Sequence, residues 1–261
     1  MDAGHDVALV VTQPDRRRGR GSALLPTPVK EAATALGLRV TDRVDDVLDT
    51  GAELGVVVAY GRLVKPHVLD AVPMVNVHFS LLPRWRGAAP VERAILAGDA
   101  ETGVCLMGLE VGLDTGPVYR RAVVEIGREE TADELRGRLV DLGTGLLVEA
   151  LAGGLGDGVP QEGEPTYAAK LDVQELCLDW SLPADELERV VRVGRAWTTF
   201  RGRRLKVRHA CAHRLTGAGL AVPTGTVALE LLDVQPEGRG PMAASDWARG
   251  VRWQDGDRLG T

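Results

Sequence analysis

The chain has 261 residues, with 44% hydrophobic and 26% charged side chains and a formal net charge of −6. This balance excludes a disordered, collagen-like or coiled-coil protein, and there is no stretch of about 18 consecutive apolar residues that could span a membrane. The three cysteines are scattered without paired spacing, and the first segment does not resemble a secretory signal. Both observations predict a soluble cytoplasmic protein with reduced thiols.

Strand and helix signals alternate through the first part of the chain. Residues 6–12 and 55–60 are nearly continuous apolar runs, typical of strands buried on both faces. Thr27, followed by proline, marks the start of one helix, and the capping box that begins at Thr131 marks another. Further strands are expected at 38–40, 74–79, 103–109 and 118–126, and a further helix at 90–97. The alternation predicts an α/β domain with a mostly parallel, doubly wound sheet.

The sequence changes character after a connector rich in glycine, proline and glutamate. A helix is expected at 181–193, then strands at 196–200, 204–210 and 226–235, and a last helix at 241–249. This pattern favours a small antiparallel β unit of the compact barrel type. We therefore expect a first domain at 1–155, a linker at 156–174 and a C-terminal domain at 175–261.

Charge is distributed unevenly between the two parts of the chain. Residues 1–174 carry 18 basic and 26 acidic side chains, a net charge of −8, whereas residues 175–261 carry 13 and 11, a net charge of +2. Seven basic residues and no acidic one lie between Arg195 and Arg214. This basic segment fits a polyanion bound at one edge of an acidic protein. A solvent-exposed hairpin in an arginine-rich chain explains it equally well.

The segment from Asn76 to Pro90 is the richest in candidate functional residues. Asn76 and His78 are two apart on an expected strand, so their side chains point to the same face. They lie where the strand runs out into a loop, the position at which open α/β sheets bind ligands. An amide beside an imidazole suits the stabilisation of an oxyanion. A hydrogen-bonded polar pair at a strand end is the simpler explanation of this motif alone.

A second candidate is Asp114, in the turn-rich link at 108–117 between two apolar strands. A carboxylate presented between glycines on a loop can take up a proton or set the orientation of a histidine. The commoner role of such an aspartate is to start a turn through its own backbone. The residue alone therefore leaves both interpretations open.

Several segments, taken together, resemble one known family. NVHFSLLPRWRGAAP at 76–90, LMGLEVGLDTGP at 106–117, TQPDRRRGRG at 12–21 and AWTTFRGRRLKV at 196–207 are similar to segments of the methionyl-tRNA formyltransferases. The likeness follows the same order along most of the chain, which makes it far more specific than one short motif.

The resemblance implies transfer of a formyl group from 10-formyltetrahydrofolate to the amino group of methionine on initiator tRNA in bacteria. It implies a Rossmann-like catalytic domain at 1–155 and a small C-terminal β-barrel, OB-like, that binds tRNA. Asn76 and His78 match residues that hydrogen-bond the oxyanion, and Asp114 matches one that orients the histidine and helps move a proton. The segment that lines the folate site in this family matches Ser80, Leu81, Leu82 and Pro83.

The resemblance also links the basic residues to tRNA. The tRNA-contacting loop of the family matches Arg16, Arg17, Arg18 and Arg20. The basic hairpin of its C-terminal domain matches Arg201, Arg203, Arg204, Lys206 and Arg208. On the same basis we expect a monomer that needs no metal and has no membrane partner.

The chain departs from the family pattern in two places. The family normally begins with a further βα unit, and residues 1–6 fall where its helix ends, so we expect an upstream unit in the native protein. The tail is also shorter before Trp197 and before Thr226. A catalytically inactive tRNA-binding remnant therefore stays an alternative, as does formyl transfer to another amine such as a sugar nucleotide.

Overall fold

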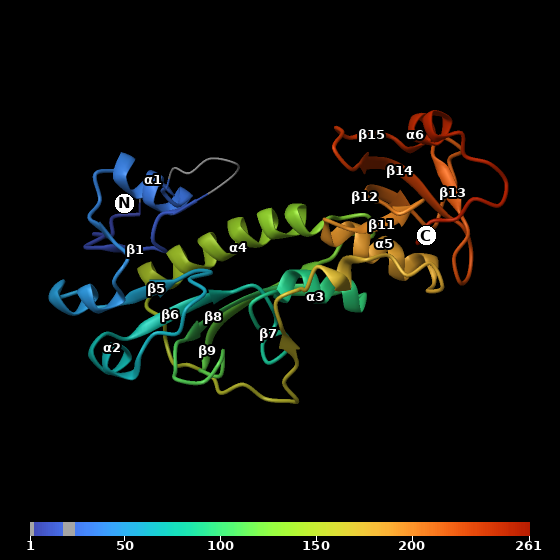
Figure 1. Cartoon of the computed structure of the whole chain (residues 1–261). Helices are drawn as coiled ribbons and strands as arrows, with labels where there is room; N and C mark the ends of the chain where they lie inside the picture. The colour runs from blue at the N-terminus through green and yellow to red at the C-terminus, as the bar shows by residue number, and fades with distance from the viewer. Residues whose placement is uncertain (1–2, 18–23) are drawn as a thin grey trace. The chain divides into compact units, whose positions relative to one another are not determined.

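The computed structural model describes residues 3–17 and 24–261, which form two compact units (Figure 1). The first unit takes the described residues of Met1–Ala88 together with Gly103–Val123 and Asp141–Tyr167. The second unit takes Ala89–Thr102, Val124–Val140 and Ala168–Thr261. The chain therefore passes from one unit to the other several times.

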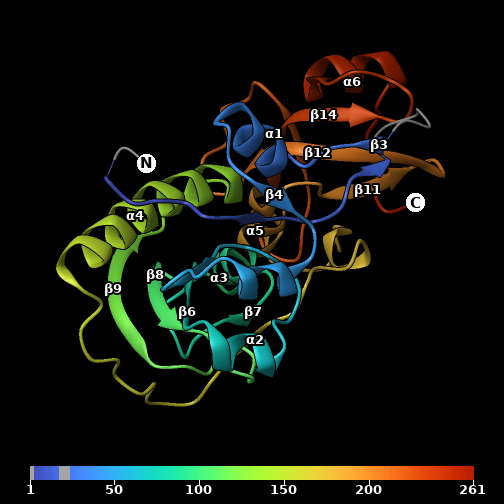
Figure 2. The same cartoon turned by 90° about the vertical axis from the view of Figure 1, so that its left-hand side faces the viewer.

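A four-stranded sheet with the order β5-β6-β8-β9 forms the centre of the first unit (Figure 1), and Figure 2 shows β6, β8 and β9 from another side. Its strands are β5 (Gly55–Val57), β6 (Met74–His78), β8 (Glu101–Gly108) and β9 (Val118–Glu125). Strands β5 and β6 are parallel, with Val57 opposite Asn76, whereas β6 and β8 are antiparallel, with His78 opposite Cys105. A separate parallel pair joins β1 (Val10–Val11) to β4 (Val40–Thr41). The Rossmann-like α/β fold is confirmed, with an antiparallel partner for β6 that the strand–helix alternation does not predict.

Two helices start at the caps that the sequence predicts. Thr27 accepts a hydrogen bond from the Lys30 backbone N–H at 3.0 Å, at the start of α1 (Pro28–Ala35). At the start of α4 (Ala132–Gly153), the Thr131 backbone N–H donates to Glu134 at 2.9 Å, and the Glu134 N–H donates back to the Thr131 hydroxyl. Such reciprocal bonds satisfy backbone donors that a helix end leaves free.

Helix α4 lies close to the sheet because Gly143 has no side chain. A Cβ at Gly143 would lie 2.8 Å from Val77 and 3.3 Å from Val104, both of which belong to the sheet. Both valines are buried. The close approach therefore puts the helix directly against the strand that carries Asn76 and His78.

Several short elements fall outside the sequence prediction. They are α2 (Pro66–Ala71), the 3₁₀ helices Val44–Asp49 and Gln174–Leu176, and the two-residue strands β2 (Arg16–Arg17), β3 (Leu24–Leu25), β7 (Arg86–Gly87) and β10 (Tyr167–Ala168). Segments of two to six residues are too short to show a hydrophobic period. No helix in the described part of the chain is both long and apolar enough to cross a membrane.

The second unit is built on a five-stranded antiparallel sheet. Its strands are β11 (Trp197–Phe200), β12 (Arg203–Cys211), β13 (Leu220–Val222), β14 (Leu229–Pro236) and β15 (Met242–Ala243). The hydrogen-bonded order is β11-β12-β14-β13, and β15 adds to β14. The antiparallel C-terminal β unit expected from the sequence is thereby confirmed, as a curled half-barrel.

Helices α5 (Ala184–Val193) and α6 (Ala244–Val251) pack on this sheet, and α3 (Pro90–Ala97) packs on α5. The core between them contains Leu187, Leu205 and Leu231, each at most 2% exposed. Phe200 and Trp247 meet edge to face with ring centroids 5.2 Å apart, a favoured aromatic geometry. Helix α3 falls inside the expected first domain 1–155 but belongs to the second unit because of its packing on α5. The domain boundaries stay a prediction.

Candidate active site

His78 is the last residue of β6, and its side chain is buried. Alternation along the strand puts Asn76 and His78 on the same face, opposite Met107 and Cys105 of β8. His78 is 5% exposed, and Asn76 is partly buried. His78 therefore ends a strand that is parallel to β5, and Asn76 lies two residues earlier on the same face of that strand.

Asp114 reaches His78 from a different segment of the first unit. It lies on the loop between β8 and β9, and its φ of 50° places it in the left-handed region. Its Oδ2 atom lies 3.7 Å from His78 Nδ1 and accepts a hydrogen bond from the Gly87 backbone N–H at 2.7 Å. The Asp114 side chain is 11% exposed. The structure thus brings together the carboxylate and the imidazole that the sequence proposes as partners.

The second ring nitrogen of His78 defines the tautomer. Nε2 lies 2.9 Å from the backbone oxygen of Trp85, which can only accept a hydrogen bond. Nε2 must therefore carry a hydrogen in this arrangement, and Nδ1 faces the carboxylate. The Nε2 hydrogen bond fixes the orientation of the ring and leaves Nδ1 beside the Asp114 carboxylate.

The loop after β6 is held by hydrogen bonds to the chain around Thr166. The Trp85 backbone N–H donates to the Thr166 hydroxyl at 2.9 Å, and the Arg86 backbone N–H donates to the Thr166 carbonyl at 2.9 Å. Trp85 itself has a φ of 62°, in the left-handed region. These contacts hold the Trp85 carbonyl against His78.

The four residues expected to line a folate site form the first part of this loop. Ser80 is fully buried and its hydroxyl donates to the Arg84 carbonyl at 2.6 Å. Leu82 is 1% exposed and packs with Cys105 and other core residues. Leu81 and Pro83 are partly exposed. The segment therefore has a preformed shape in which the Ser80 and Leu82 side chains already have partners, leaving mainly backbone groups for a ligand.

Gln161 is a site residue that the sequence analysis missed. Its amide nitrogen donates to the carbonyl oxygens of Asp114 and Gly116, both at 2.8 Å, and its amide oxygen accepts from Arg86 at 2.7 Å. Gln161 therefore holds the Asp114 loop and the loop after β6 in one arrangement. It lies in the glycine- and proline-rich segment that the sequence presents as a connector. A lone glutamine in such a segment carries no signal of this role.

Cys105 lies opposite His78 in the sheet but plays no charged role. Its thiol is fully buried, and burial raises its pKa, although contacts with Leu82 and Arg121 oppose the shift. A thiol with a raised pKa stays protonated at neutral pH and is a poor nucleophile. Cys105 therefore serves as packing beneath the candidate site.

The candidate tRNA-binding arginines near the start of the chain are described only in part. Arg16 and Arg17 form β2 and are exposed, and Arg16 donates to the Gln13 side chain at 3.3 Å. Arg18 and Arg20 lie outside the described residues. Exposure of the first two leaves them accessible to a phosphate backbone.

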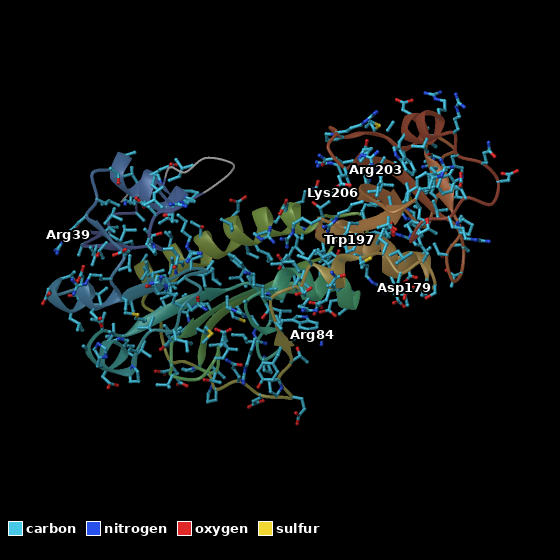
Figure 3. The ribbon with its side chains drawn as sticks, viewed as in Figure 1. Arg39, Arg84, Asp179, Trp197, Arg203 and Lys206 are labelled. Carbon is cyan, nitrogen blue, oxygen red and sulfur yellow. The ribbon has the colours of Figure 1, made fainter. Side chains whose placement is uncertain are left out.

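Basic side chains form an exposed row on β12 of the second unit. Arg204, Lys206 and Arg208 alternate with buried residues, so they share the outer face of the strand. Lys206 lies opposite Trp197 of β11, and the Arg204 guanidinium carbon is 4.1 Å from the Trp197 ring centroid. Figure 3 shows Trp197 and Lys206 on this sheet. We call Arg204, Lys206 and Arg208 the β12 basic row.

Arg201 and Arg203 occupy the turn before this row. Arg203 is exposed at the first position of β12. Arg201 donates to both oxygens of Asp257, at 3.0 and 3.2 Å, and stacks on Phe200. The Gln254 backbone N–H and the Arg201 guanidinium hold the pKa of Asp257 below its usual range. Arg201 therefore already has an anionic partner, whereas the structure as described gives the β12 basic row no ion pair.

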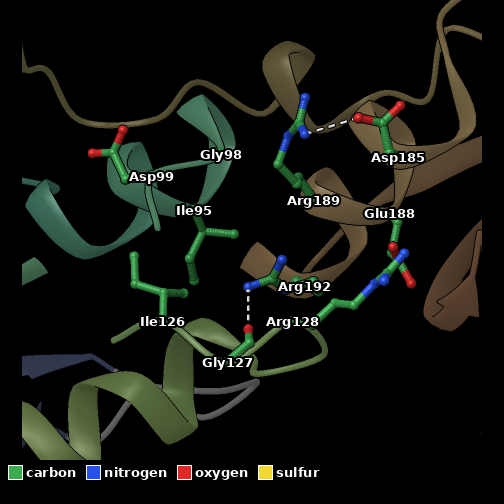
Figure 4. Close-up of a pocket in the computed structure, with 10 residues that line it drawn as sticks. All are labelled: Ile95, Gly98, Asp99, Ile126, Gly127, Arg128, Asp185, Glu188, Arg189 and Arg192. Carbon is green, nitrogen blue, oxygen red and sulfur yellow. Dashed lines mark hydrogen bonds and ion pairs between the residues drawn. The ribbon is translucent and has the colours of Figure 1, made fainter. Parts of the chain in front are cut away.

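A cavity of about 230 Å³ lies within the second unit (Figure 4). Ten residues from three segments line it: Ile95, Gly98, Asp99, Ile126, Gly127, Arg128, Asp185, Glu188, Arg189 and Arg192. Arg189 pairs with Asp185 at 3.0 Å, and Arg192 donates to the Gly127 carbonyl at 2.9 Å. Arg189 and Arg192 therefore already have partners within the cavity wall, and we assign the cavity no ligand.

Comparison with known proteins gives matches along both parts of the chain. A family model described as "Formyl transferase" matches residues 2–151, and one described as "Formyl transferase, C-terminal domain" matches residues 170–252. A methionyl-tRNA formyltransferase from Roseobacter denitrificans is 44% identical over 97% of this chain and 91% of its own length.

Two solved structures have a similar fold at low sequence identity. HypX from Aquifex aeolicus, solved in complex with tetrahydrofolic acid, matches with a TM-score of 0.63 at 16% identity. That match covers 87% of this chain but 45% of HypX, so this chain spans less than half of that protein. A methionyl-tRNA formyltransferase from Clostridium thermocellum matches with a TM-score of 0.57 at 15% identity, over 81% of this chain and 92% of that one.

Proposed function

The chain belongs to the methionyl-tRNA formyltransferase family, and we propose that it transfers the formyl group of 10-formyltetrahydrofolate to the methionine amino group of initiator tRNA. The observation that carries the proposal is the pairing of His78 Nδ1 with Asp114 at 3.7 Å in a buried site at the end of β6. A histidine fixed by a carboxylate suits reactions in which charge develops on a carbonyl oxygen.

The chemical step joins the methionine nitrogen to the formyl carbon and releases the folate nitrogen N10 from that carbon. The methionine amine attacks the formyl carbon, forming a C–N bond and a tetrahedral intermediate with a negatively charged oxygen. His78 Nε2–H and the Asn76 amide are the donors for this oxygen, so the N–H that now faces Trp85 is shared with the substrate. The C–N10 bond then breaks, and a proton passes from the amine to N10.

The Asp114 carboxylate is the group that carries this proton. Its Oδ2 lies beside His78 and is held by the Gly87 N–H, and Gln161 holds the backbone carbonyl of the same residue. The carboxylate also stabilises the imidazolium if His78 gains a second proton during the reaction. In this proposal, Asp114 both orients the His78 ring and carries the proton from the methionine amine to N10 of the folate.

The proposed folate loop and the β12 basic row belong to two different parts of the chain. The loop from Ser80 to Pro83 supports the folate proposal, because it follows directly on His78 and has a preformed shape. The exposed β12 basic row supports the tRNA proposal, since phosphate contacts supply much of the affinity for nucleic acid.

The decisive experiment offers 10-formyltetrahydrofolate together with one acceptor at a time. The acceptors are methionyl initiator tRNA and an amino-sugar nucleotide, and the measurement is the formylated product of each. We expect product from the tRNA reaction alone. Formylation of the sugar nucleotide but not of the tRNA would overturn the choice of substrate. Tight tRNA binding by the folded protein without any turnover would instead support the inactive remnant.

A further inference from the structure

A group of metal-binding side chains lies in the second unit, outside the candidate active site. Cys211 is the last residue of β12, His213 follows two residues later, and Glu129 comes from the turn before α4. One ligand atom from each residue lies within 4.8 Å of the other two. The Cys211 thiol is buried, whereas Glu129 is exposed and can adjust its position.

The distances within this group approach those of a tetrahedral metal site. Zinc–ligand bonds of about 2.0–2.3 Å place neighbouring ligand atoms of a tetrahedron about 3.3–3.8 Å apart. Cys211 Sγ lies 3.6 Å from His213 Nδ1 and 3.9 Å from His213 Nε2, and a Glu129 oxygen lies 2.9 Å from Nε2. Binding of one ion by Sγ, Nε2 and the carboxylate therefore requires a turn of the imidazole ring that points Nε2 toward Cys211, together with an outward shift of the exposed Glu129.

A buried carboxylate supports the imidazole from its other side. Glu188 of α5 is 7% exposed, and its Oε1 lies 3.5 Å from His213 Nδ1. The same oxygen accepts a hydrogen bond from the Ala212 backbone N–H at 3.3 Å. Metal-bound histidines commonly donate their second N–H to a carboxylate, which fixes the ring and raises its basicity as a ligand. Nε2 faces Glu129 at 2.9 Å, and Cys211 Sγ lies within 3.9 Å of both ring nitrogens.

We propose that Cys211, His213 and Glu129 form a zinc-binding site, with Glu188 orienting His213 and water completing the tetrahedron. The thiolate–imidazole–carboxylate set is typical of zinc, whereas calcium and magnesium favour oxygen ligands. The sequence alone predicts no metal, because the cysteines have no paired spacing and the fold brings in Glu129 from a distant segment. The ion links the end of β12 to the turn before α4.

The first test titrates the metal-free full-length protein with Co²⁺, which replaces zinc and reports its ligands by absorption. Cysteine ligation gives a thiolate-to-cobalt charge-transfer band, and tetrahedral geometry gives strong visible bands. We expect both, with one equivalent bound, and we expect Zn²⁺ to displace the signal. Thermal unfolding in Zn²⁺ should give a raised Tm that returns to its starting value after a chelator is added.

Variants separate this site from adventitious binding. Glu129→Gln changes an exposed ligand and should weaken Zn²⁺ binding by about tenfold or more. Cys211→Ser should abolish the charge-transfer band. The matched control Cys177→Ser removes the thiol of a partly buried cysteine elsewhere in the same unit, and His209→Asn removes an exposed histidine of the same strand. Both controls should bind Co²⁺ like the unchanged protein.

Two results would overturn the proposal. One is a Co²⁺ spectrum without the charge-transfer band, which would show that Cys211 and His213 form a hydrogen-bonded pair without metal. The other is Zn²⁺ affinity that stays the same in Glu129→Gln and in Cys211→Ser. Because Glu129 is on the surface, its variant keeps the test valid even if Cys211→Ser fails to fold. None of these measurements depends on formyl transfer.

Discussion

His78 is a residue whose two ring nitrogens have different tasks. Nδ1 faces the Asp114 carboxylate at 3.7 Å, and Nε2 faces a backbone oxygen at 2.9 Å. The tautomer is therefore fixed before any substrate arrives. A donor that is already oriented costs no reorganisation when charge develops on the substrate, which is the basis of oxyanion stabilisation.

Replacing His78 with alanine should remove this donor. We expect kcat to fall by about 10²–10³, the usual cost of losing one oxyanion donor, together with the loss of proton handling through Asp114. The measurement is formylation of methionyl-tRNA, with Tm recorded for each variant. His67→Ala is the matched control, because His67 is 53% exposed and pairs with Asp45 outside the candidate site. Nearly full activity of His78→Ala would show that the proposed mechanism is wrong.

Asp114 and Gln161 show where sequence reasoning stops. The pattern in β6 predicts that Asn76 and His78 share a face, because alternation is a property of any strand. The meeting of Asp114 with His78 depends instead on a left-handed φ of 50° and on two hydrogen bonds from Gln161. Long-range contacts of this kind leave no periodic trace in the sequence, so the catalytic role of Asp114 enters from the family resemblance.

At the level of elements, β12 combines a core face and an exposed basic face in one strand. Leu205 and Val207 are buried, and the β12 basic row lies between and beyond them on the outer face. This alternation is readable in the sequence, which is why the basic segment and its strand are both predicted. The partner of Arg201 is not readable, because Asp257 lies near the other end of the unit's chain.

Neutralising the β12 basic row should weaken tRNA binding in a salt-dependent way. In the triple variant Arg204→Gln, Lys206→Gln, Arg208→Gln, each lost phosphate contact should lower the log–log salt slope by about 0.7–0.9. The measurement is the Kd for initiator tRNA at several salt concentrations. A control with the same charge change replaces the exposed Arg249, Arg252 and Arg258 by glutamine. If the log–log salt slope falls by the same amount in both triple variants, the β12 basic row has no special part in tRNA binding.

Glu230 ties a loop of the second unit to the centre of its sheet. The residue is 1% exposed on β14, and it accepts hydrogen bonds from the Thr216 and Gly219 backbone N–H groups at 2.5 and 2.9 Å. Burial by itself raises the pKa of this carboxyl, but the backbone donors outweigh it and hold the pKa below 4.5. The ionised form is therefore the one that stabilises the loop.

The lowered pKa makes a prediction about acid stability. Because the folded-state pKa lies below the unfolded value near 4.5, the stabilisation is complete above that pH and is lost as the pH falls through the folded value. Glu230→Gln should lower the free energy of unfolding at pH 7 by about 1–3 kcal/mol. It should also flatten the dependence of unfolding free energy on pH below about 4.5. Urea unfolding at several pH values measures both, and an unchanged acid slope would contradict the argument.

At the scale of the whole molecule, the sequence indicates which elements exist better than how the chain groups them. Helix caps at Thr27 and Thr131 are local signals, and the structure confirms these helices and the α/β and antiparallel β parts. The apolar runs at 6–12 and 55–60 form strands only at Val10–Val11 and Gly55–Val57, and neither strand is buried on both faces as the sequence predicts. The assignment of α3 to the second unit comes from its packing on α5, a contact between distant segments. Grouping therefore depends on tertiary contacts that no local pattern encodes.

The two proposed tasks of the molecule should be separable by mutation. The candidate catalytic residues Asn76, His78 and Asp114 belong to the first unit, and the β12 basic row belongs to the second. His78→Ala should therefore leave the Kd for initiator tRNA and its salt slope unchanged while formylation is lost. The β12 triple variant should bind a formyl-folate analogue like the unchanged protein, but should need more tRNA for half-maximal rate, with its loss concentrated in kcat/KM and growing with salt. Paired tRNA-binding, folate-binding and kinetic measurements on the same preparations check this. If His78→Ala lost tRNA affinity as strongly as the triple variant, chemistry and tRNA binding would not be divided between these groups of residues.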